Sequence, residues 1–166
     1  MTQTSVMFNP RTSPYNALWM HSIEMAAPSF GVSVAQTSIQ SEDDVRSTID
    51  VLGTRPGSSL IVLSDSYTYE HSALIASLAA SKRIPAVYAF SRFVHDGGLI
   101  AYGVDLIEQF GRAAVYIDRV LKGEKTAELP VQGPTRYTMA INLRTAKALG
   151  LTIAPGLIAA ADEVIE

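Results

Sequence analysis

The chain has 166 residues, a formal net charge of −3 and no cysteine. A chain of this length buries roughly 70% of the surface that its unfolded form exposes, so one hydrophobic core suffices without covalent cross-links. The composition excludes disulfides, thiolate metal sites and cysteine nucleophiles. Because neither sign of charge is gathered into a block, nucleic acid is not expected as a partner.

The apolar stretches are too short to span a membrane. The longest, Leu60–Leu63 and Ile84–Phe90, fall far below the ~20 residues that a bilayer requires. Met1–Pro10 has no basic segment followed by an apolar run, so no secretory signal is predicted. If the chain is the complete gene product, these features predict a cytoplasmic protein.

Strands and helices alternate through the first 103 residues. Ser13 followed by Pro14 is typical of a helix N-cap and first helical position, and Ser41 before three acidic residues predicts a second cap. The pattern predicts strands at 5–8, 32–39, 60–63, 86–90 and 99–102, and helices at 13–28, 41–53 and 68–82. This order predicts a doubly wound, mostly parallel α/β sheet with right-handed crossovers.

The pattern changes after residue 103. Val104–Lys122 is the longest helical segment, and its apolar positions cover more than one third of the helix circumference. A polar linker at 123–130 leads to a strand around 137–141, an alanine-rich helix at 143–149 and a last helical turn after Pro155. We therefore predict an α/β core at 1–103 and a segment at 104–166 that adds a crossover helix, a linker and a closing strand and helix to the same lobe.

Ligands of open α/β sheets bind beyond the carboxyl ends of the strands, which selects four loops here. The loop at 9–15 places polar side chains at a helix N-terminus, which favours an anionic group. The alternative is that Ser13 serves only as a helix cap. Asp65 is either an N-cap or the counterion of a ligand ammonium, and Tyr67 adds a ring. The loop at 90–93 is either an apolar wall with a cation or a plug of the sheet end. The candidate ligand-binding residues are Asn9, Ser13, Tyr15, Asp65, Tyr67, Tyr102 and Asp105.

The motifs of common catalytic and cofactor sites are missing. The sequence has no GxGxxG, no GxxxxGK[ST] and no GxSxG, so it predicts neither a nucleotide cofactor nor a serine hydrolase. Its three histidines, His21, His71 and His95, are too scattered for a metal site, and the acidic run at 42–44 is a helix start. We predict no cofactor, no metal and no enzymatic activity. An enzyme would need Asp65 or Asp105 as a general base, without a convincing second group.

Several runs resemble the substrate-binding proteins of a bacterial ABC transporter family, whose members include tryptophan and tyrosine binders. The resemblance lies in Val6–Pro10, Leu60–Asp65, Arg83–Tyr88, Gly97–Gly103, Leu129–Gln132 and Ile141–Leu151. It implies a type I periplasmic binding fold, in which two α/β lobes close on a small molecule. Members of that family run to roughly twice this length, so the chain resembles the C-terminal lobe alone.

The resemblance implies a binding component of an importer for a small, amino-acid-like or aromatic molecule, which docks on an ABC permease. It would act in the periplasm or on a lipid anchor. An isolated lobe supplies half of the cleft, so weak or undetectable ligand binding is expected. The alternative is a stand-alone cytoplasmic regulatory domain of the same fold that binds a ligand or dimerises.

The resemblance also implies that Val104–Lys122 packs on the lobe that this chain does not contain. Burying each of its apolar side chains is worth on the order of 1.5 to 3 kcal/mol. We therefore expect this helix either to fold back onto its own sheet or to be buried in a homodimer through Leu106–Leu121, with exchange between chains as one route.

Overall fold

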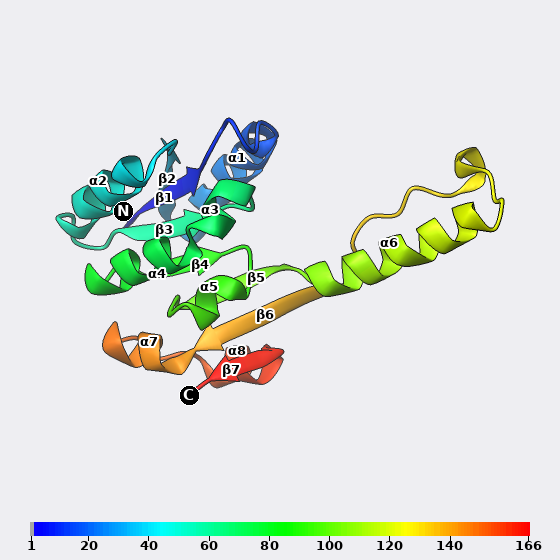
Figure 1. Cartoon of the computed structure of the whole chain (residues 1–166). Helices are drawn as coiled ribbons and strands as arrows, with labels where there is room; N and C mark the ends of the chain where they lie inside the picture. The colour runs from blue at the N-terminus through cyan, green and yellow to red at the C-terminus, as the bar shows by residue number, and fades with distance from the viewer. Residues whose placement is uncertain (1) are drawn as a thin grey trace.

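The computed structural model describes residues 2–166, which form a seven-stranded sheet with helices on both faces (Figure 1). The strand order is β2-β1-β3-β4-β5-β6-β7. Strands β1 to β5 pair in parallel, β6 runs antiparallel to β5, and β7 is parallel to β6. The strands are β1 (Thr2–Phe8), β2 (Val32–Ser38), β3 (Ser59–Val62), β4 (Ala86–Tyr88), β5 (Ile100–Val104), β6 (Tyr137–Asn142) and β7 (Glu163–Ile165). The predicted doubly wound, mostly parallel α/β fold is confirmed.

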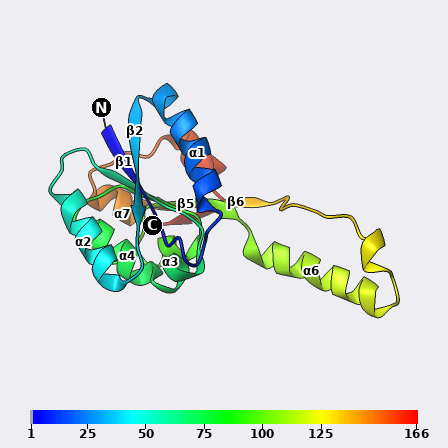
Figure 2. The same ribbon diagram turned by 90° about the horizontal axis from the view of Figure 1, so that it is seen from above.

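The helices divide between the two faces of the sheet (Figure 2). Helix α1 lies on one side, and α2 and α4 lie on the other. The α-helices are α1 (Asn16–Ala26), α2 (Glu42–Gly53), α3 (Ser66–Glu70), α4 (Ser72–Ser81), α5 (Arg92–His95), α6 (Leu106–Leu121), α7 (Leu143–Ala148) and α8 (Pro155–Ala160). Two 3₁₀ turns, η1 (Ala27–Phe30) and η2 (Thr126–Glu128), complete the set.

The hydrophobic core is double, as a sheet covered on both faces requires. The larger part joins α2, α4 and α5 to the sheet, with Ile49, Ile75 and Phe93 fully buried. The smaller part lies under α1, where Met20 packs with Val6 and its neighbours. Alternate residues of each strand enter the two parts, because successive side chains of a strand point to opposite faces.

Helix α6 does not touch the sheet. It leaves the end of β5 and projects from the domain, and residues 123–136 run back beside it to β6 (Figure 1). None of its residues is buried, and Phe110 is 74% and Ile117 59% exposed. The expectation that this helix folds back onto its own sheet is therefore wrong. The closing strand and helix do return to the sheet, through β6, α7 and β7.

Local sequence signals account for most helix starts. Ser41 and Asp44 form a capping box at the start of α2, in which the hydroxyl accepts from the Asp44 amide and the carboxylate accepts from the Ser41 amide. The Gln40 amide, which also donates to the Asp44 carboxylate, lowers the pKa of Asp44 most, and the hydrogen bonds with the Ser41 hydroxyl and amide lower it further. Asp65 caps α3, which confirms the N-cap alternative for this residue, and Asp105 caps α6.

Several boundaries differ from those predicted. Helix α1 begins at Asn16 instead of Ser13, because the Ser13 hydroxyl donates to the Ser64 carbonyl and not to its own helix. The helix predicted at 68–82 is broken at His71, where the backbone leaves the helical region and the imidazole stacks on Tyr67. The short elements α5 and β7 were not predicted, since four and three residues carry too little periodicity.

Two glycines allow close packing around β5, Gly103 near its carboxyl end and Gly98 just before its first residue. A Cβ on Gly103, in β5, would lie 1.9 Å from the Ala89 carbonyl oxygen, and one on Gly98 would lie 2.7 Å from that of Phe93. No side chain fits at either distance, so these residues bring β5 and the connection after β4 together.

Candidate functional site

The carboxyl ends of β1 and β3 are tied together by Asp65. Its carboxylate accepts from the amides of Asn9 (3.1 Å) and Thr68 (2.8 Å) and from the Thr12 hydroxyl (3.3 Å). The side chain is only 4% exposed, and both of its oxygens are engaged. Its partners fix the position of both loops, because a buried carboxylate is stable only when it is fully hydrogen-bonded.

The residues expected in the first loop have separate roles. Asn9 and Ser13 are buried at the Asp65 junction, and Asn9 also accepts from the Arg11 amide. Tyr15 is exposed and packs edge-on against Trp19, with ring centroids 5.4 Å apart. Of the three expected residues in this loop, Tyr15 is therefore the one that is exposed to the solvent.

Tyr67 faces α2 rather than the centre of the edge. Its ring stacks on His71, and the carboxylates of Glu42 and Asp44 lie close enough to act on the phenol. Desolvation first, and these carboxylates next, raise the pKa of Tyr67. The hydroxyl therefore stays protonated, as a neutral donor, at physiological pH.

A cavity of about 470 Å³ opens beside the ends of β4 and β5. Tyr69 and Phe90 form one wall as an edge-to-face pair with centroids 5.2 Å apart, and the Arg92 guanidinium lies 5.7 Å from the Tyr69 ring centre. Asp105 and Glu163 belong to other parts of the lining. The cavity thus combines an aromatic wall with groups of both charges, which suits a small zwitterion with an apolar side chain.

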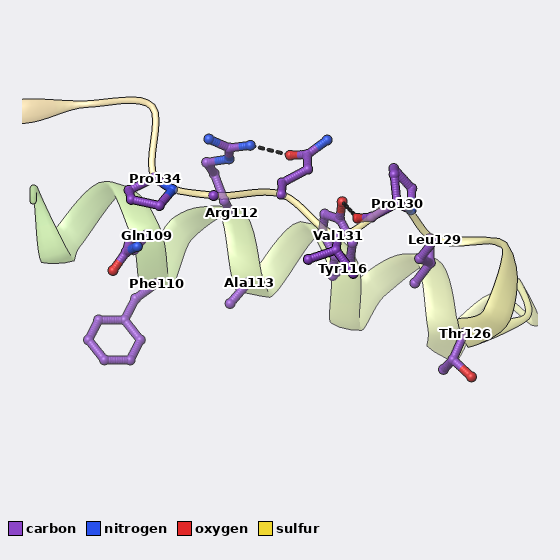
Figure 3. A pocket seen from close by; sticks show the side chains of 12 residues that line it. Gln109, Phe110, Arg112, Ala113, Tyr116, Thr126, Leu129, Pro130, Val131 and Pro134 are labelled. Carbon is purple, nitrogen blue, oxygen red and sulfur yellow. Dashed lines mark hydrogen bonds between the residues drawn. The ribbon is translucent and has the colours of Figure 1, made fainter. Parts of the chain in front are cut away.

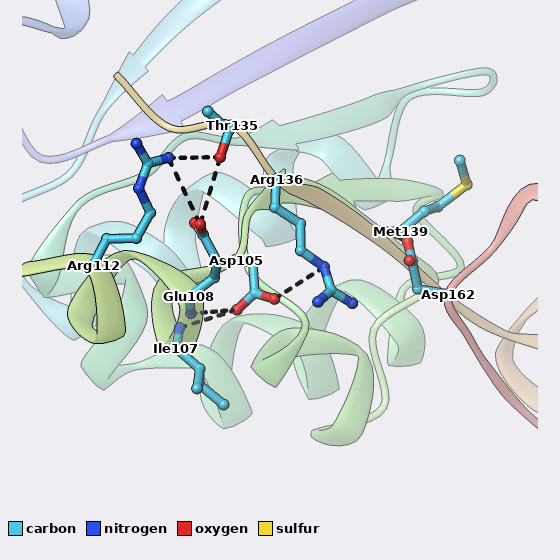
Figure 4. Close-up of polar contacts among 8 residues, drawn as sticks. All are labelled: Asp105, Ile107, Glu108, Arg112, Thr135, Arg136, Met139 and Asp162. Carbon is cyan, nitrogen blue, oxygen red and sulfur yellow. Dashed lines mark hydrogen bonds and ion pairs between the residues drawn. The ribbon is translucent and has the colours of Figure 1, made fainter. Parts of the chain in front are cut away.

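Asp105 is held in place at the junction of β5, α6 and β6 (Figure 4). One carboxylate oxygen accepts from the amides of Ile107 and Glu108, and the other lies 3.4 Å from Nε of Arg136. Of the seven expected residues, Asp105 alone lines the 470 Å³ cavity. Tyr102 lies on the adjacent strand surface, is 57% exposed and stacks on Tyr137 at 5.9 Å.

The loop at 90–93 takes both of the roles predicted for it, the plug of the sheet end and the apolar wall with a cation. Phe93 is fully buried and stacks on Tyr88, so it plugs the end of the sheet. Phe90 and Arg92 face the cavity and form the wall with a cation. Tyr69, Arg136 and Glu163 were not singled out. Tyr69 lies two residues after the expected Tyr67, which is the one local signal that could have found it, whereas nothing local places the starts of β6 and β7 at this edge.

A second concavity, of about 620 Å³, lies on the projecting arm between α6 and the returning chain (Figure 3). Its lining is mainly apolar, and its polar groups already bind one another: Arg112 donates to Gln132, and the Tyr116 hydroxyl donates to the Pro130 carbonyl at 2.7 Å. A ligand would find few free polar groups there. The cavity at the strand ends is therefore the better candidate for a small molecule.

Within residues 2–166, no three histidine, aspartate or glutamate side chains gather in a way that could hold a metal ion. No helix in that range combines the length and apolarity needed to cross a bilayer.

The structure thus forms an open α/β lobe with a cavity at the carboxyl ends of its central strands. The chain matches the family described as ABC transporter substrate binding protein over residues 3–165, and it belongs to that family. A search of the curated proteins gave no match.

Three solved structures share the fold. The ABC domain in complex with L-Trp from Streptococcus pneumonia has a TM-score of 0.87 and 22% identity, covering 99% of this chain and 55% of that one. A conserved domain protein from Vibrio cholerae O1 biovar El Tor has a TM-score of 0.85 and 21% sequence identity, and the match covers 98% of this chain and 54% of that one. A substrate binding protein with adhesive properties from Clostridium difficile, in its ligand-free, open structure, has a TM-score of 0.68 and 20% sequence identity. This match covers 99% of this chain and 54% of that one. This chain thus spans about half the length of the structures that it matches.

Proposed function

We propose that the chain is the C-terminal lobe of the substrate-binding component of an ABC importer, and that it supplies one wall of a cleft for an amino-acid-like, aromatic molecule. Family membership supports a ligand-binding, non-enzymatic role, and proteins of this family typically act outside the cytoplasm. The observation that carries the proposal is the 470 Å³ cavity at the strand ends, which joins Tyr69 and Phe90 to Arg92 and Asp105.

Each cavity group has a distinct part in this proposal. The aromatic wall packs against the side chain of the ligand, and the Arg92 guanidinium holds its carboxylate. Asp105, Asp162 and Glu163 are the carboxylates on the cavity lining that attract its ammonium. Asp65 positions the two loops behind this wall, and its own contact with an ammonium stays a prediction. The complex of a relative with L-Trp supports an aromatic amino acid as the first ligand to test.

The second wall of the cleft comes from the other lobe, when the two lobes close on the ligand. A lobe that covers 55% of a relative's chain offers half of the contacts, so its affinity for the ligand is low. In the full-length protein, two lobes close on the ligand and present it to a permease. In this arrangement the projecting α6 and residues 123–136 lie against the other lobe.

Nuclear magnetic resonance titration with L-tryptophan tests the proposal. We expect fast-exchange shifts at Tyr69, Phe90, Arg92 and Asp105, with a dissociation constant in the millimolar range, as weak one-sided contact implies. Arg92→Ala should remove these shifts, whereas Arg46→Ala, which removes an exposed guanidinium of α2, should keep them. Shifts confined to the arm cavity, or none at millimolar tryptophan, would contradict the proposed site, and micromolar affinity would contradict the half-cleft.

The same titration distinguishes the roles of Asp65 and Asp105 in binding the ligand. Asp105→Asn should weaken binding while the fold stays intact, because this carboxylate lies at the surface of the cavity. Asp65→Asn should mainly lower stability. If Asp65→Asn keeps its stability and loses the tryptophan shifts, then Asp65 and not Asp105 is the ammonium partner.

A further inference from the structure

The three carboxylates on the lining of the 470 Å³ cavity have different partners. Asp105 is bound by two backbone amides and an arginine (Figure 4), and Asp162 accepts from the Met139 amide at 2.8 Å. Glu163 is bound by a histidine, since Nε2 of His95 lies 2.8 Å and 3.0 Å from its two oxygens. Of these partners, only the imidazole is of a kind that changes charge between about pH 5 and 8. The charge that Glu163 presents to the cavity therefore depends on the state of its partner.

The backbone that carries His95 is fastened to the rest of the lobe. His95 ends the short helix α5, in which Val94 is fully buried. The Val94 carbonyl accepts from the Asn142 side chain at 3.3 Å, and the Asp96 carboxylate accepts from the Ser72 hydroxyl at 2.6 Å. The imidazole therefore reaches β7 from a fixed origin, and it ties the first side chain of that strand to α5.

Glu163 lies where both the solvent and a ligand can reach it. It begins β7, a strand of three residues that pairs with β6, and its direct neighbour there is Ala140. The side chains of His95 and Glu163 are 51% and 47% exposed. Because water screens such a pair, its mutual attraction is modest, and a cation in the cavity can compete for the carboxylate.

The elements packed around α5 add few charges to this pair. Helix α4 and strands β5 and β6 pack on α5 and contain no aspartate, glutamate, lysine, arginine or histidine. Helix α3 touches α5 through the Tyr69 ring, and α7 reaches the turn after α5 through Thr145. The titratable or charged residues on all these elements, on α5 itself, at its end and next to Glu163 are Tyr67, Tyr69, Glu70, Arg92, Asp96, Tyr102, Tyr137, Arg144, Lys147 and Asp162. The list contains no second histidine, and the nearest one in sequence, His71, is engaged with the Tyr67 carbonyl and Glu42 instead.

We propose that His95 positions Glu163 for the ammonium group of the ligand and that, by taking up a proton, it weakens the hold of the cavity on that group. This inference rests on the proposed function, in which the carboxylates of the lining attract the ammonium. Neutral His95 donates one hydrogen bond and leaves the negative charge of Glu163 to the ligand. Protonated His95 forms an ion pair with Glu163, so the ammonium must compete with it. By linkage, a proton on His95 and an ammonium ligand weaken one another's binding to the same extent.

Nuclear magnetic resonance titration with two probes, at about pH 7.5 and about pH 5.5, tests this role. L-Tryptophan carries the ammonium, whereas indole-3-propionate has the same ring and carboxylate without it. The dissociation constant of L-tryptophan should rise about three- to fivefold at the lower pH, which is the scale of one half-exposed ion pair. The dissociation constant of indole-3-propionate should not rise, because this probe has no group that competes with His95.

Three variants assign the effect to the pair. His95→Gln keeps a hydrogen-bond donor but cannot take up a proton, so the rise for L-tryptophan should disappear. Glu163→Gln removes the same pair from the other side and should abolish the rise as well. The matched control is His71→Gln, which removes the other histidine–glutamate contact, with Glu42 at 3.7 Å, and should keep the rise.

Circular dichroism at both pH values verifies that each variant is folded. The proposal would be overturned by a dissociation constant of L-tryptophan that is the same at both pH values, by a rise that persists in folded His95→Gln or Glu163→Gln, or by an equal rise for indole-3-propionate. Tryptophan shifts at neither pH would contradict the proposed function and this regulation together. Tryptophan shifts without pH dependence would contradict the role of His95 alone.

Discussion

Helices α4 and α6 show how differently the two ends of this molecule use apolar residues. Helix α4 is apolar on most sides and buries Ile75, Ala76 and Ala79 between the sheet and its neighbours. Helix α6 is strongly amphipathic, and none of its side chains is buried. A helix that is apolar all round belongs inside its own domain, whereas a single apolar face that stays exposed indicates a partner outside it.

The two helices are also stabilised differently. Tertiary packing holds α4, whereas α6 depends on its Asp105 cap and on surface ion pairs such as Lys122 with Asp118 at 2.8 Å. Each such pair contributes only about 0.2 to 0.5 kcal/mol. We therefore expect the sheet domain to unfold cooperatively and the arm to open locally at much lower cost.

The largest expected effect is the difference in stability between two substitutions, one of an isoleucine in α4 and one of an isoleucine in α6. Ile75→Ala should lower the free energy of unfolding by about 3 to 4 kcal/mol, because it leaves a cavity in the core. Ile117→Ala should change that free energy by less than about 0.5 kcal/mol in dilute solution, since the residue contacts mainly solvent. Urea denaturation at low protein concentration measures both. Equal losses would show that the arm is part of the cooperative domain.

Removing the Asp65 carboxylate should have the next largest effect. Asp65→Ala leaves the buried amides of Asn9 and Thr68 without an acceptor, so we expect a loss of about 2 to 3 kcal/mol. Asp43→Ala, at an exposed position of α2, is the control and should cost little. A loss below 1 kcal/mol for Asp65→Ala would mean that the two loops are fixed by other contacts.

Two glycines should respond in opposite directions. Gly103→Ala forces a methyl group against the Ala89 carbonyl, and we expect a loss of about 2 kcal/mol. Gly111→Ala, within α6, has open space for the methyl group and removes the helix cost of glycine, which is about 1 kcal/mol. Denaturation should report the first change, and only hydrogen exchange of α6 amides the second. A stable Gly103→Ala protein would contradict the close approach.

The smallest expected effect is at the capping box of α2. Ser41→Ala should cost about 1 kcal/mol. Backbone hydrogen bonds lower the pKa of Asp44 in the folded state, so its contribution is present above the unfolded-state pKa and is lost as the pH falls through the folded-state pKa. Asp44→Asn should therefore be destabilising at pH 7 and nearly neutral below pH ~3. A difference that persists unchanged at acidic pH would contradict this role.

Local patterns were sufficient for the sheet but not for the cavity. Alternation, the Ser41 cap and the Asp65 cap depend on neighbours within four residues, and each was predictable. Ser13 was misread, because its hydroxyl binds a carbonyl 51 residues away. Arg136 reaches Asp105 only because β6 returns antiparallel to β5, which no local pattern encodes.

The arm illustrates the same limit. The sequence predicted an apolar face on residues 106–121, since that follows from helical periodicity alone. It could not show that this helix leaves the sheet, because the choice depends on the path of residues 123–136 back to β6.

Hydrogen exchange at submicromolar concentration tests the contrast between sheet domain and arm most directly. Amides of α4 should exchange only through global unfolding, while those of α6 should exchange orders of magnitude faster, through local opening. Protection of α6 equal to that of α4 in the dilute monomer would contradict a projecting, unpartnered helix.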